Sequence, residues 1–387
     1  MRILNELPCC GTSLRNLFKK RIPPSRILIR MFHNLFNEKE SRKRGLKSIP
    51  VTLSTRIRLA RNISDYPFPG RAETSQKRAV LSMCMNAMSG LKGLNNSTSV
   101  EVDDLSELDR QILVEKHLIS PELSQVEEGS GIVLTEDRDC CIMINEEDHL
   151  RIQALRPGLD FGNVWQKVDE LDTGIDSVVR YAYDCDLGFL TACPTNLGTG
   201  MRASVMMHLP GLVMSKNMDK VINAVNQLGI AVRGLFGEGS DANGSIFQIS
   251  NQQTLGESEK AIIDRLKNTL ENIVKQENFA REKLLQDDGN RLIDKISRAV
   301  GVLKTSYLIQ SSEAMDHLSL IRLASDFKML PEKFRSLADR MFIEIQPGHV
   351  QLSAGKPVNP SDRDHLRAEL LRKEFVRVPQ INPDGPS

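Results

Sequence analysis

The chain has 387 residues, with 51 lysines and arginines against 50 acidic residues, and 40% of its residues are hydrophobic. This composition is ordinary for a globular protein and allows two or three domains with full hydrophobic cores. No stretch approaches the roughly 18 apolar residues of a membrane-spanning helix, and a net charge of +1 gives no general attraction to nucleic acid or anionic lipid. We therefore expect neither a membrane protein nor a nucleic-acid binder.

The seven cysteines are scattered along the chain without the paired CxxC spacing of zinc sites or of a secreted disulfide framework. This pattern predicts a reducing, cytoplasmic environment and no metal site built from protein side chains.

The first 48 residues form a separate compositional unit, with 12 lysines and arginines against 3 acidic residues, a net charge of +9. Lysines, arginines and prolines interrupt its apolar residues, so a secretory signal is a poor fit. We predict a poorly ordered basic extension over residues 1–48. Met31 offers an alternative start of translation, in which case the first thirty residues would not belong to the protein.

Residues 49–255 alternate short β-like runs with helical stretches. Strands are predicted at 51–59 and 140–144, where the residues alternate or form a short apolar run. Helices are predicted at 77–88, 104–116, 205–213 and 219–229, the last with Gly229 as its C-terminal cap.

Beyond Leu255 the pattern becomes helical almost throughout. Ile262, Leu266, Leu270 and Ile273 recur at helical spacing, residues 254–257 could form a capping box, and the last helix is expected at 361–375. We therefore predict an α+β fold in which a catalytic domain over 49–255, with an antiparallel sheet flanked by helices, precedes a helical C-terminal domain over 256–387.

Arginines are the first candidates for a nucleotide site, because the sequence holds neither a Walker loop nor a GxGxxG motif. Arg56 and Arg58 stand two apart on a predicted strand and so project from one face, where two guanidinium groups could grip one polyphosphate. Taken alone, paired strand arginines are more often a solvated face.

Three further segments combine charge with turn residues. Residues 144–151 place three carboxylates, an imidazole and a guanidinium after a buried strand, a position where catalytic groups are often displayed. Residues 191–204 form a Pro- and Gly-rich loop, after which Arg202 is expected to open a helix. Arg233 and Glu238 lie on a third, glycine-rich loop. Each segment could also be a plain exposed turn.

Together these motifs resemble those of the ATP:guanido phosphotransferases, the family of creatine and arginine kinases. The ordered matches are Ser54-Thr55-Arg56-Ile57-Arg58, Asn145-Glu146-Glu147-Asp148-His149-Leu150-Arg151, Cys193-Pro194-Thr195-Asn196-Leu197-Gly198-Thr199, Arg202-Ala203-Ser204 and Arg233-Gly234 followed by Gly237-Glu238. Within the family the chain is most similar to bacterial protein arginine kinases of the McsB type, through Glu115-Lys116-His117-Leu118-Ile119-Ser120-Pro121, Phe247-Gln248-Ile249-Ser250-Asn251-Gln252 and Arg363-Asp364-His365-Leu366-Arg367-Ala368. The resemblance covers about residues 50 to 375.

The resemblance implies a role for each matching residue. Five arginines would surround the ATP phosphates and His117 would lie beside the adenine, the arginines being Arg56, Arg58, Arg151, Arg202 and Arg233. Glu147 and Glu238 would hold the substrate guanidinium, and Cys193 would be the reactive thiol that affects substrate alignment. ATP and Mg²⁺ are the implied cofactors, with the metal held mostly by phosphates and water.

Two substrate classes share this chemistry, arginine side chains of proteins and a free guanidino compound such as arginine. Small-molecule kinases of the family have a helical domain of roughly a hundred residues before the first arginine pair, which closes over the free substrate, whereas only 53 residues precede Ser54 here. We therefore favour protein substrates. A third interpretation is an inactive scaffold that only binds phosphoarginine.

The resemblance also implies partners and a second site. Arg363 and Arg367 share a helix face with Asp364 beside them, and in McsB-like proteins this motif forms a phosphoarginine pocket. An exposed, salt-bridged helix is the alternative. A dimerising helical domain, a McsA-like activator, a Clp protease and a role in stress response are further expectations from the resemblance.

Overall fold

The computed structural model describes residues 50–126, 128–136, 139–235 and 242–382. The predicted basic extension over residues 1–48 lies outside the described residues, and so does Glu238. Among the described helices, none combines the length and the apolar character needed to cross a membrane.

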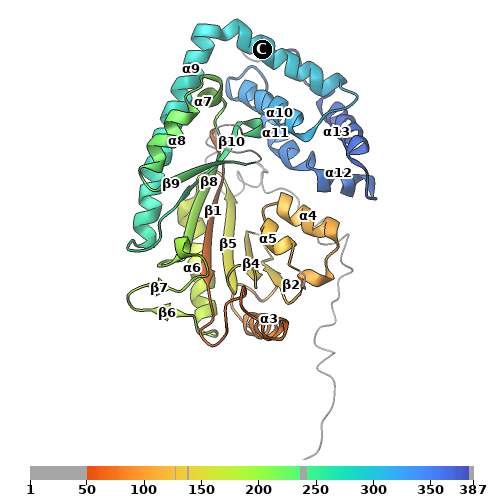
Figure 1. Ribbon diagram of the computed structural model, residues 1–387. Coiled ribbons are helices and arrows are strands. Elements are labelled where there is room, and N and C mark those ends of the chain that lie inside the picture. The colour runs from red at the N-terminus through yellow and green to blue at the C-terminus, as the bar shows by residue number, and fades with distance from the viewer. Residues whose placement is uncertain (1–49, 127, 137–138, 236–241, 383–387) are drawn as a thin grey trace, which may run out of the picture.

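An antiparallel sheet forms the centre of the molecule (Figure 1). Within the described residues it has eight strands, in the spatial order β2 (Thr98–Glu101), β3 (Gly131–Leu134), β4 (Cys140–Ile144), β5 (Leu150–Pro157), β1 (Thr52–Arg61), β8 (Met201–His208), β10 (Ile246–Asn251) and β9 (Ile230–Gly234). A separate short hairpin is formed by β6 (Tyr183–Asp184) and β7 (Gly188–Phe189).

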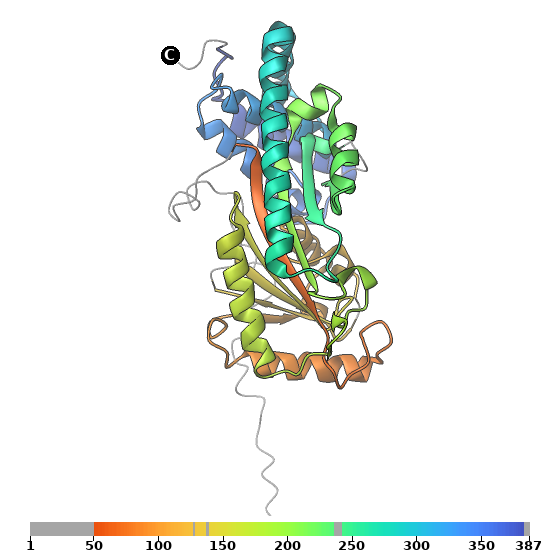
Figure 2. The same ribbon diagram turned by 90° about the vertical axis from the view of Figure 1, so that its left-hand side faces the viewer.

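Two of the helices that pack against one face of the sheet lie in front of the strands in Figure 2. They are α6 (Phe161–Asp176) and the first half of α9 (Glu259–Thr305). The buried side chains of α9 recur at helical spacing in this half, as the sequence predicted, and they join the sheet core at Ile262, Leu266, Leu270 and Ile273.

The other face is covered only in part. Near β2, β3 and β4, helices α4 (Glu107–Glu115) and α5 (Pro121–Ser124) form a small second core, in which Leu113 and Leu123 join Ile132 and Met143 of the sheet. Helix α3 (Thr74–Met88) lies across the far end of the sheet and adds to the main core (Figure 1).

The second half of α9 belongs to a helical unit at the opposite end of the sheet. Helix α9 is interrupted at Asp288, whose backbone is not helical, and beyond it Leu292 and Ile296 lie in a different core from the first half. That core is completed by α10 (Ser311–Asp326), α11 (Lys333–Glu344), α12 (Pro347–Ala354) and α13 (Pro360–Phe375). We refer to this unit as the helical domain.

A buried network of ion pairs fixes the helical domain to the end of β8. Arg322 Nε donates to Asp339 at 2.7 Å and Arg281 Nη1 donates to Asp326 at 2.8 Å. Arg281 also donates to the carbonyl oxygen of His208 at 3.2 Å, and Arg322 Nη1 lies 3.1 Å from His208 Nδ1. Burial, reinforced by the two arginine charges, holds the pKa of His208 well below its usual value, so this imidazole is neutral.

Most predicted elements are confirmed, with two exceptions. The helix predicted at 205–213 is wrong, because 201–208 forms the interior strand β8 and only α7 (Pro210–Met214) is helical. Arg202 therefore lies within a strand and does not open a helix. The strand is almost entirely buried between β1 and β10, and the short apolar run of Val205, Met206 and Met207 within it looks the same in a buried helix.

The capping box predicted at 254–257 is also misplaced. Ser258 is the N-cap of α9, and its hydroxyl accepts from the Ala261 N–H at 3.3 Å. The helix predicted at 219–229 is confirmed as α8 (Met218–Asn226), with Gly229 at a φ of 68° just beyond it.

Candidate active site

Strand register places the predicted phosphate-binding arginines on one face of the sheet. Arg58 is paired directly with Arg202 of β8 on one side and with Gln153 of β5 on the other. Residues directly opposite each other share a face, and so do residues two apart on one strand. Arg56 and Arg151 therefore lie on the same face as Arg58 and Arg202.

The fifth arginine reaches this face through β10. Arg233 of β9 is paired with Gln248, and Gln248 is paired with Met206, four residues along β8 from Arg202. The Gln248 side chain also accepts a hydrogen bond of 2.6 Å from Arg56 Nη2. Gln248 thus connects two of the strands that carry arginines.

The arginine cluster concentrates positive charge in a partly desolvated place. Burial first, then the charges of Arg151 and Arg202, lower the pKa of Arg56 to about 10, and the pKa of Arg58 is held well below its usual value in the same way. Burial and the charges of Arg233 and Arg151 lower the pKa of Arg202. The Nε atoms of Arg56 and Arg58 are buried without a hydrogen-bond partner. Such a cluster fits a ligand with several negative charges.

The turn between β4 and β5 is built by its polar side chains. Asn145 takes a left-handed backbone conformation with φ 56°, and its amide Nδ2 donates to the Gly129 carbonyl at 2.7 Å. Asp148 is buried and accepts from Asn62 Nδ2 at 2.5 Å and from the Ala192 N–H at 2.7 Å. These contacts fix the two ends of the turn.

The turn leaves its two glutamates in different environments. Glu146 accepts a hydrogen bond of 2.5 Å from Arg151 Nη1 and contacts the Ser120 hydroxyl. Glu147 is exposed, and partial burial first, then the charges of Asp148 and Glu146, raise its pKa. Of these carboxylates, Glu147 is the one presented at the surface of the site.

The loop carrying Cys193 lies beside this turn and the arginines. Arg202 lies close enough to Cys193 and Glu147 for the ionised forms of both groups to raise its pKa. Cys193 is half-buried, with its Sγ 3.0 Å from Thr195 Oγ1, and the loop is held by Thr254, whose hydroxyl donates to the Thr195 carbonyl at 3.0 Å. The thiol is therefore positioned at the edge of the arginine cluster.

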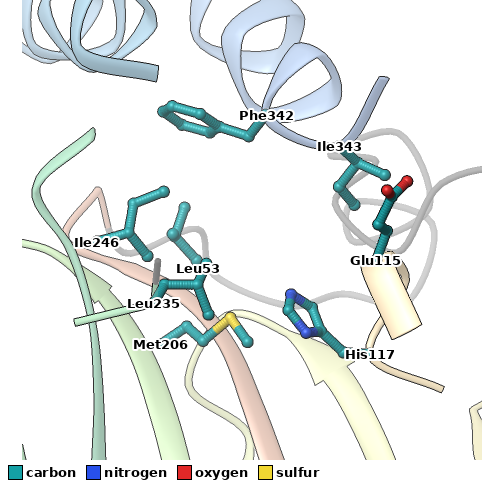
Figure 3. A pocket seen from close by; sticks show the side chains of 8 residues that line it. All are labelled: Leu53, Glu115, His117, Met206, Leu235, Ile246, Phe342 and Ile343. Atoms are coloured by element: carbon teal, nitrogen blue, oxygen red, sulfur yellow. The ribbon is translucent and has the colours of Figure 1, made fainter. Parts of the chain in front are cut away.

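His117 follows α4 in a left-handed conformation with φ 58°. Its carbonyl oxygen accepts a hydrogen bond of 3.1 Å from Gln153 Nε2. Burial first and then the charge of Arg56 lower its pKa to about 3, so the imidazole is neutral. The ring lines a mainly apolar pocket, shown in Figure 3, together with Leu53, Glu115, Met206, Leu235, Ile246, Phe342 and Ile343.

The three residues of the predicted phosphoarginine pocket lie on α13. Arg367 is only 2% exposed, and it donates from Nε to the Ile345 carbonyl at 2.7 Å and from Nη1 to the Ile309 carbonyl at 2.9 Å. Its Nη1 also donates to Asp364 at 2.5 Å, and burial lowers its pKa. Arg363 is half-buried on the same helix. Arg367 is therefore also a structural contact between α13 and the end of α11.

Sequence reasoning assigned no role to two residues that hold the cluster. In the sequence Gln248 and Glu146 stand out only as members of family motifs, and Glu146 also as part of an acidic run. The signal for Gln248 was its strand position, because it stands on the same face as its pairing partner Arg233. For Glu146 the spacing to Arg151 gives no signal, since a tight turn must first bring the two together.

The comparisons with known proteins agree with this arrangement. Residues 79–280 match the ATP:guanido phosphotransferase C-terminal catalytic domain, which is more than half of the chain. The chain therefore belongs to the ATP:guanido phosphotransferase family, as the motifs predicted. Residues 289–384 match the C-terminal domain of the protein-arginine kinase McsB.

Its curated relatives are protein-arginine kinases. The chain is 42% identical to the protein-arginine kinase of Shouchella clausii, over 84% of this chain and 91% of the relative. It is 43% identical to that of Bacillus cereus strain B4264, over 84% of this chain and 92% of the relative.

Among solved structures, similarity is found to phosphagen kinases. A duplicated taurocyamine kinase of Schistosoma mansoni gives a TM-score of 0.56 at 21% identity, over 72% of this chain and 46% of that one. The chain thus spans about half the length of the duplicated kinase. A lombricine kinase gives a TM-score of 0.51 at 25% identity, over 60% of this chain and 68% of that one. The likeness to the taurocyamine kinase shows the fold alone.

Proposed function

We propose that this protein transfers the γ-phosphoryl group of ATP to the guanidinium of arginine side chains in proteins. The observation that carries the proposal is the arginine cluster with two unpartnered buried Nε atoms, bordered by an exposed glutamate and a half-buried thiol. The names of the curated relatives support protein arginine as the substrate.

The arginines would bind and align the phosphates. In phosphoryl transfer the protein contributes mainly positioning and charge stabilisation, and fixed guanidinium groups supply both. Arg56, Arg58, Arg151, Arg202 and Arg233 fill this role in the proposal. Mg²⁺ would accompany ATP and neutralise phosphate charge, held by phosphate oxygens and water, since the described residues offer no cluster of three or more His, Cys, Asp or Glu side chains as metal ligands.

The glutamates would prepare the nucleophile. A guanidinium holds its proton tightly, so attack on phosphorus requires a carboxylate that orients the group and accepts the proton as the N–P bond forms. The bond from the γ-phosphorus to the bridging oxygen breaks, and ADP leaves. The exposure of Glu147 at the site supports this role, and its raised pKa makes it a better proton acceptor. We propose Glu238 as the second carboxylate and Cys193 as a group that aligns the substrate.

Further parts of the proposal rest on the resemblance to McsB-type kinases. Arg363, Asp364 and Arg367 would form a phosphoarginine pocket, and the C-terminal region predicted over 256–387 would mediate a homodimer. A McsA-like activator and a Clp protease are proposed partners, in a cytoplasmic stress response.

The test is a transfer assay with γ-labelled ATP and two substrates, unfolded casein and free arginine. We expect acid-labile, base-stable label on casein and little turnover of free arginine. Glu147→Gln should lower the rate roughly 10²- to 10⁴-fold. Glu128→Gln is the matched control, because Glu128 forms an exposed ion pair with Arg78 and lies outside the cluster. Rapid turnover of free arginine with unlabelled casein would favour a phosphagen kinase, and no turnover with retained ATP binding would favour a binding scaffold.

A further inference from the structure

The pocket beside His117 has walls from two separate parts of the fold (Figure 3). On one side lie Leu53, Met206 and Ile246, from strands of the sheet or the short segments leading into them. Phe342 and Ile343 of α11 face them from the helical domain, as the close view shows. The pocket is therefore complete only when the helical domain is docked on the sheet.

The sheet side of the pocket continues the arginine cluster along the same strands. Leu53 precedes Arg56 by three residues on β1, and Met206 follows Arg202 by four residues on β8. At about 3.3 Å per residue these steps measure roughly 10–13 Å. That is about the distance that separates the outer phosphates of a nucleoside triphosphate from its base, so a nucleotide bound at the arginines has its base near the pocket.

The pocket side chains also lie on the correct face. Met206 is an even number of residues from Arg202 on a regular strand, so both face the same way. Leu53 is an odd number from Arg56, but the pairing of β1 with β8 shifts register between Thr52 and Ser54. Leu53 accordingly packs in the helical-domain core with Met206 and not in the core behind the sheet.

The two walls are tied together by Glu115. Its carboxylate accepts from the backbone N–H of Gly348 at 2.7 Å and of His349 at 3.1 Å, at the start of α12, and from His349 Nδ1 at 2.7 Å. Glu115 stands two residues before His117, so the helix that positions the imidazole is bonded to the helix that follows Phe342 and Ile343.

We infer that the helical domain, through Phe342 and Ile343, supplies one wall of the binding site for the purine base of ATP. This inference rests on the proposed function, and it adds to it that nucleotide affinity depends on the docking of the helical domain. A flat aromatic or aliphatic surface opposite Leu53 and Met206 suits a purine, which is apolar on both faces.

The experiment compares a ligand that has a base with one that lacks it. Calorimetric titrations of ATP and of inorganic tripolyphosphate are made on the full chain, on Phe342→Ala and on Phe334→Ala. Phe334 is the matched control, because it stands on the same helix with 4% exposure against 5% for Phe342, and it does not line the pocket. We expect Phe342→Ala to raise the Kd for ATP about tenfold and to leave the Kd for tripolyphosphate unchanged. Phe334→Ala should change neither Kd.

A milder variant, Phe342→Leu, keeps most of the apolar volume and should give a smaller loss of ATP affinity in the same direction. Unchanged or tighter ATP binding in Phe342→Ala, or an equal loss for ATP and tripolyphosphate, overturns the inference. If tripolyphosphate and ATP both fail to bind the unaltered chain, the arginine cage of the proposed function fails, and the base site with it.

Discussion

Replacing Arg56 by methionine should stabilise the protein in the absence of nucleotide. Methionine keeps the apolar part of the side chain and removes a charge that the fold holds near other arginines. Burial, Arg151 and Arg202 lower the pKa of Arg56 to about 10, which corresponds to about 3 kcal/mol of unfavourable free energy for the charged form. Because the side chain is half-buried, solvent screening and the lost bond to Gln248 reduce the expected gain to roughly 1–2 kcal/mol.

The pH dependence of this gain has a definite sign. The folded state lowers the pKa of Arg56, so its charged form is penalised at every pH below about 10, and the penalty fades only as the group deprotonates above that value. The difference in stability between Arg56→Met and the unaltered chain should therefore be the same at pH 7 and pH 8.

The measurement is thermal unfolding with and without ATP. Without ATP, Arg56→Met should unfold roughly 2–4 °C above the unaltered chain. ATP at a hundred times its Kd should add about 2.7 kcal/mol to the stability of the unaltered chain, and little to that of the variant.

Arg61→Met is the matched control on the same strand. Arg61 is 2% exposed and donates to both carboxylate oxygens of Asp172, at 2.7 and 3.1 Å. Removing it leaves a mostly buried, unpaired carboxylate, so stability should fall by about 3–5 kcal/mol. A loss of stability in Arg56→Met comparable with that in Arg61→Met would refute the view that the cluster is held for an absent anion.

Three further outcomes are expected. Arg202→Lys should weaken ATP binding and slow transfer without abolishing either, because a lysine keeps the charge but lacks the planar fork, and full activity would show that geometry is not needed there. Gly198→Ala should lower stability and rate together, because at φ 106° an added Cβ would approach the Thr254 carbonyl oxygen to 2.6 Å. An unchanged melting temperature would contradict this. Arg363→Ala should abolish any response of the transfer rate to added phosphoarginine while the fold is kept. Arg367→Ala should also lower the melting temperature, because the variant loses the hydrogen bonds that Arg367 donates to two backbone carbonyls.

Several strands and helices that were predicted correctly carry a local signal of their own, in composition, in periodicity or in a helix cap. Residues 140–144 are a short apolar run, and α13 has strong helix formers behind an Asn–Pro start. Strand β8 was missed because its second half runs on towards α7 and the combined segment 205–213 shows helix-like spacing, so only pairing with β1 and β10 decides its conformation.

By itself the sequence determined the family and indicated the candidate reactive groups. Runs such as Asn145 to Arg151 are recognisable without coordinates, and alternation along one strand already places Arg56 and Arg58 on one face. Tertiary structure decided which groups meet. Arg202 stands opposite Arg58 only through strand pairing, and Glu115 reaches Gly348 across 233 positions of the chain. Such contacts are fixed by register and by packing between distant segments, and neither leaves a local pattern in the sequence.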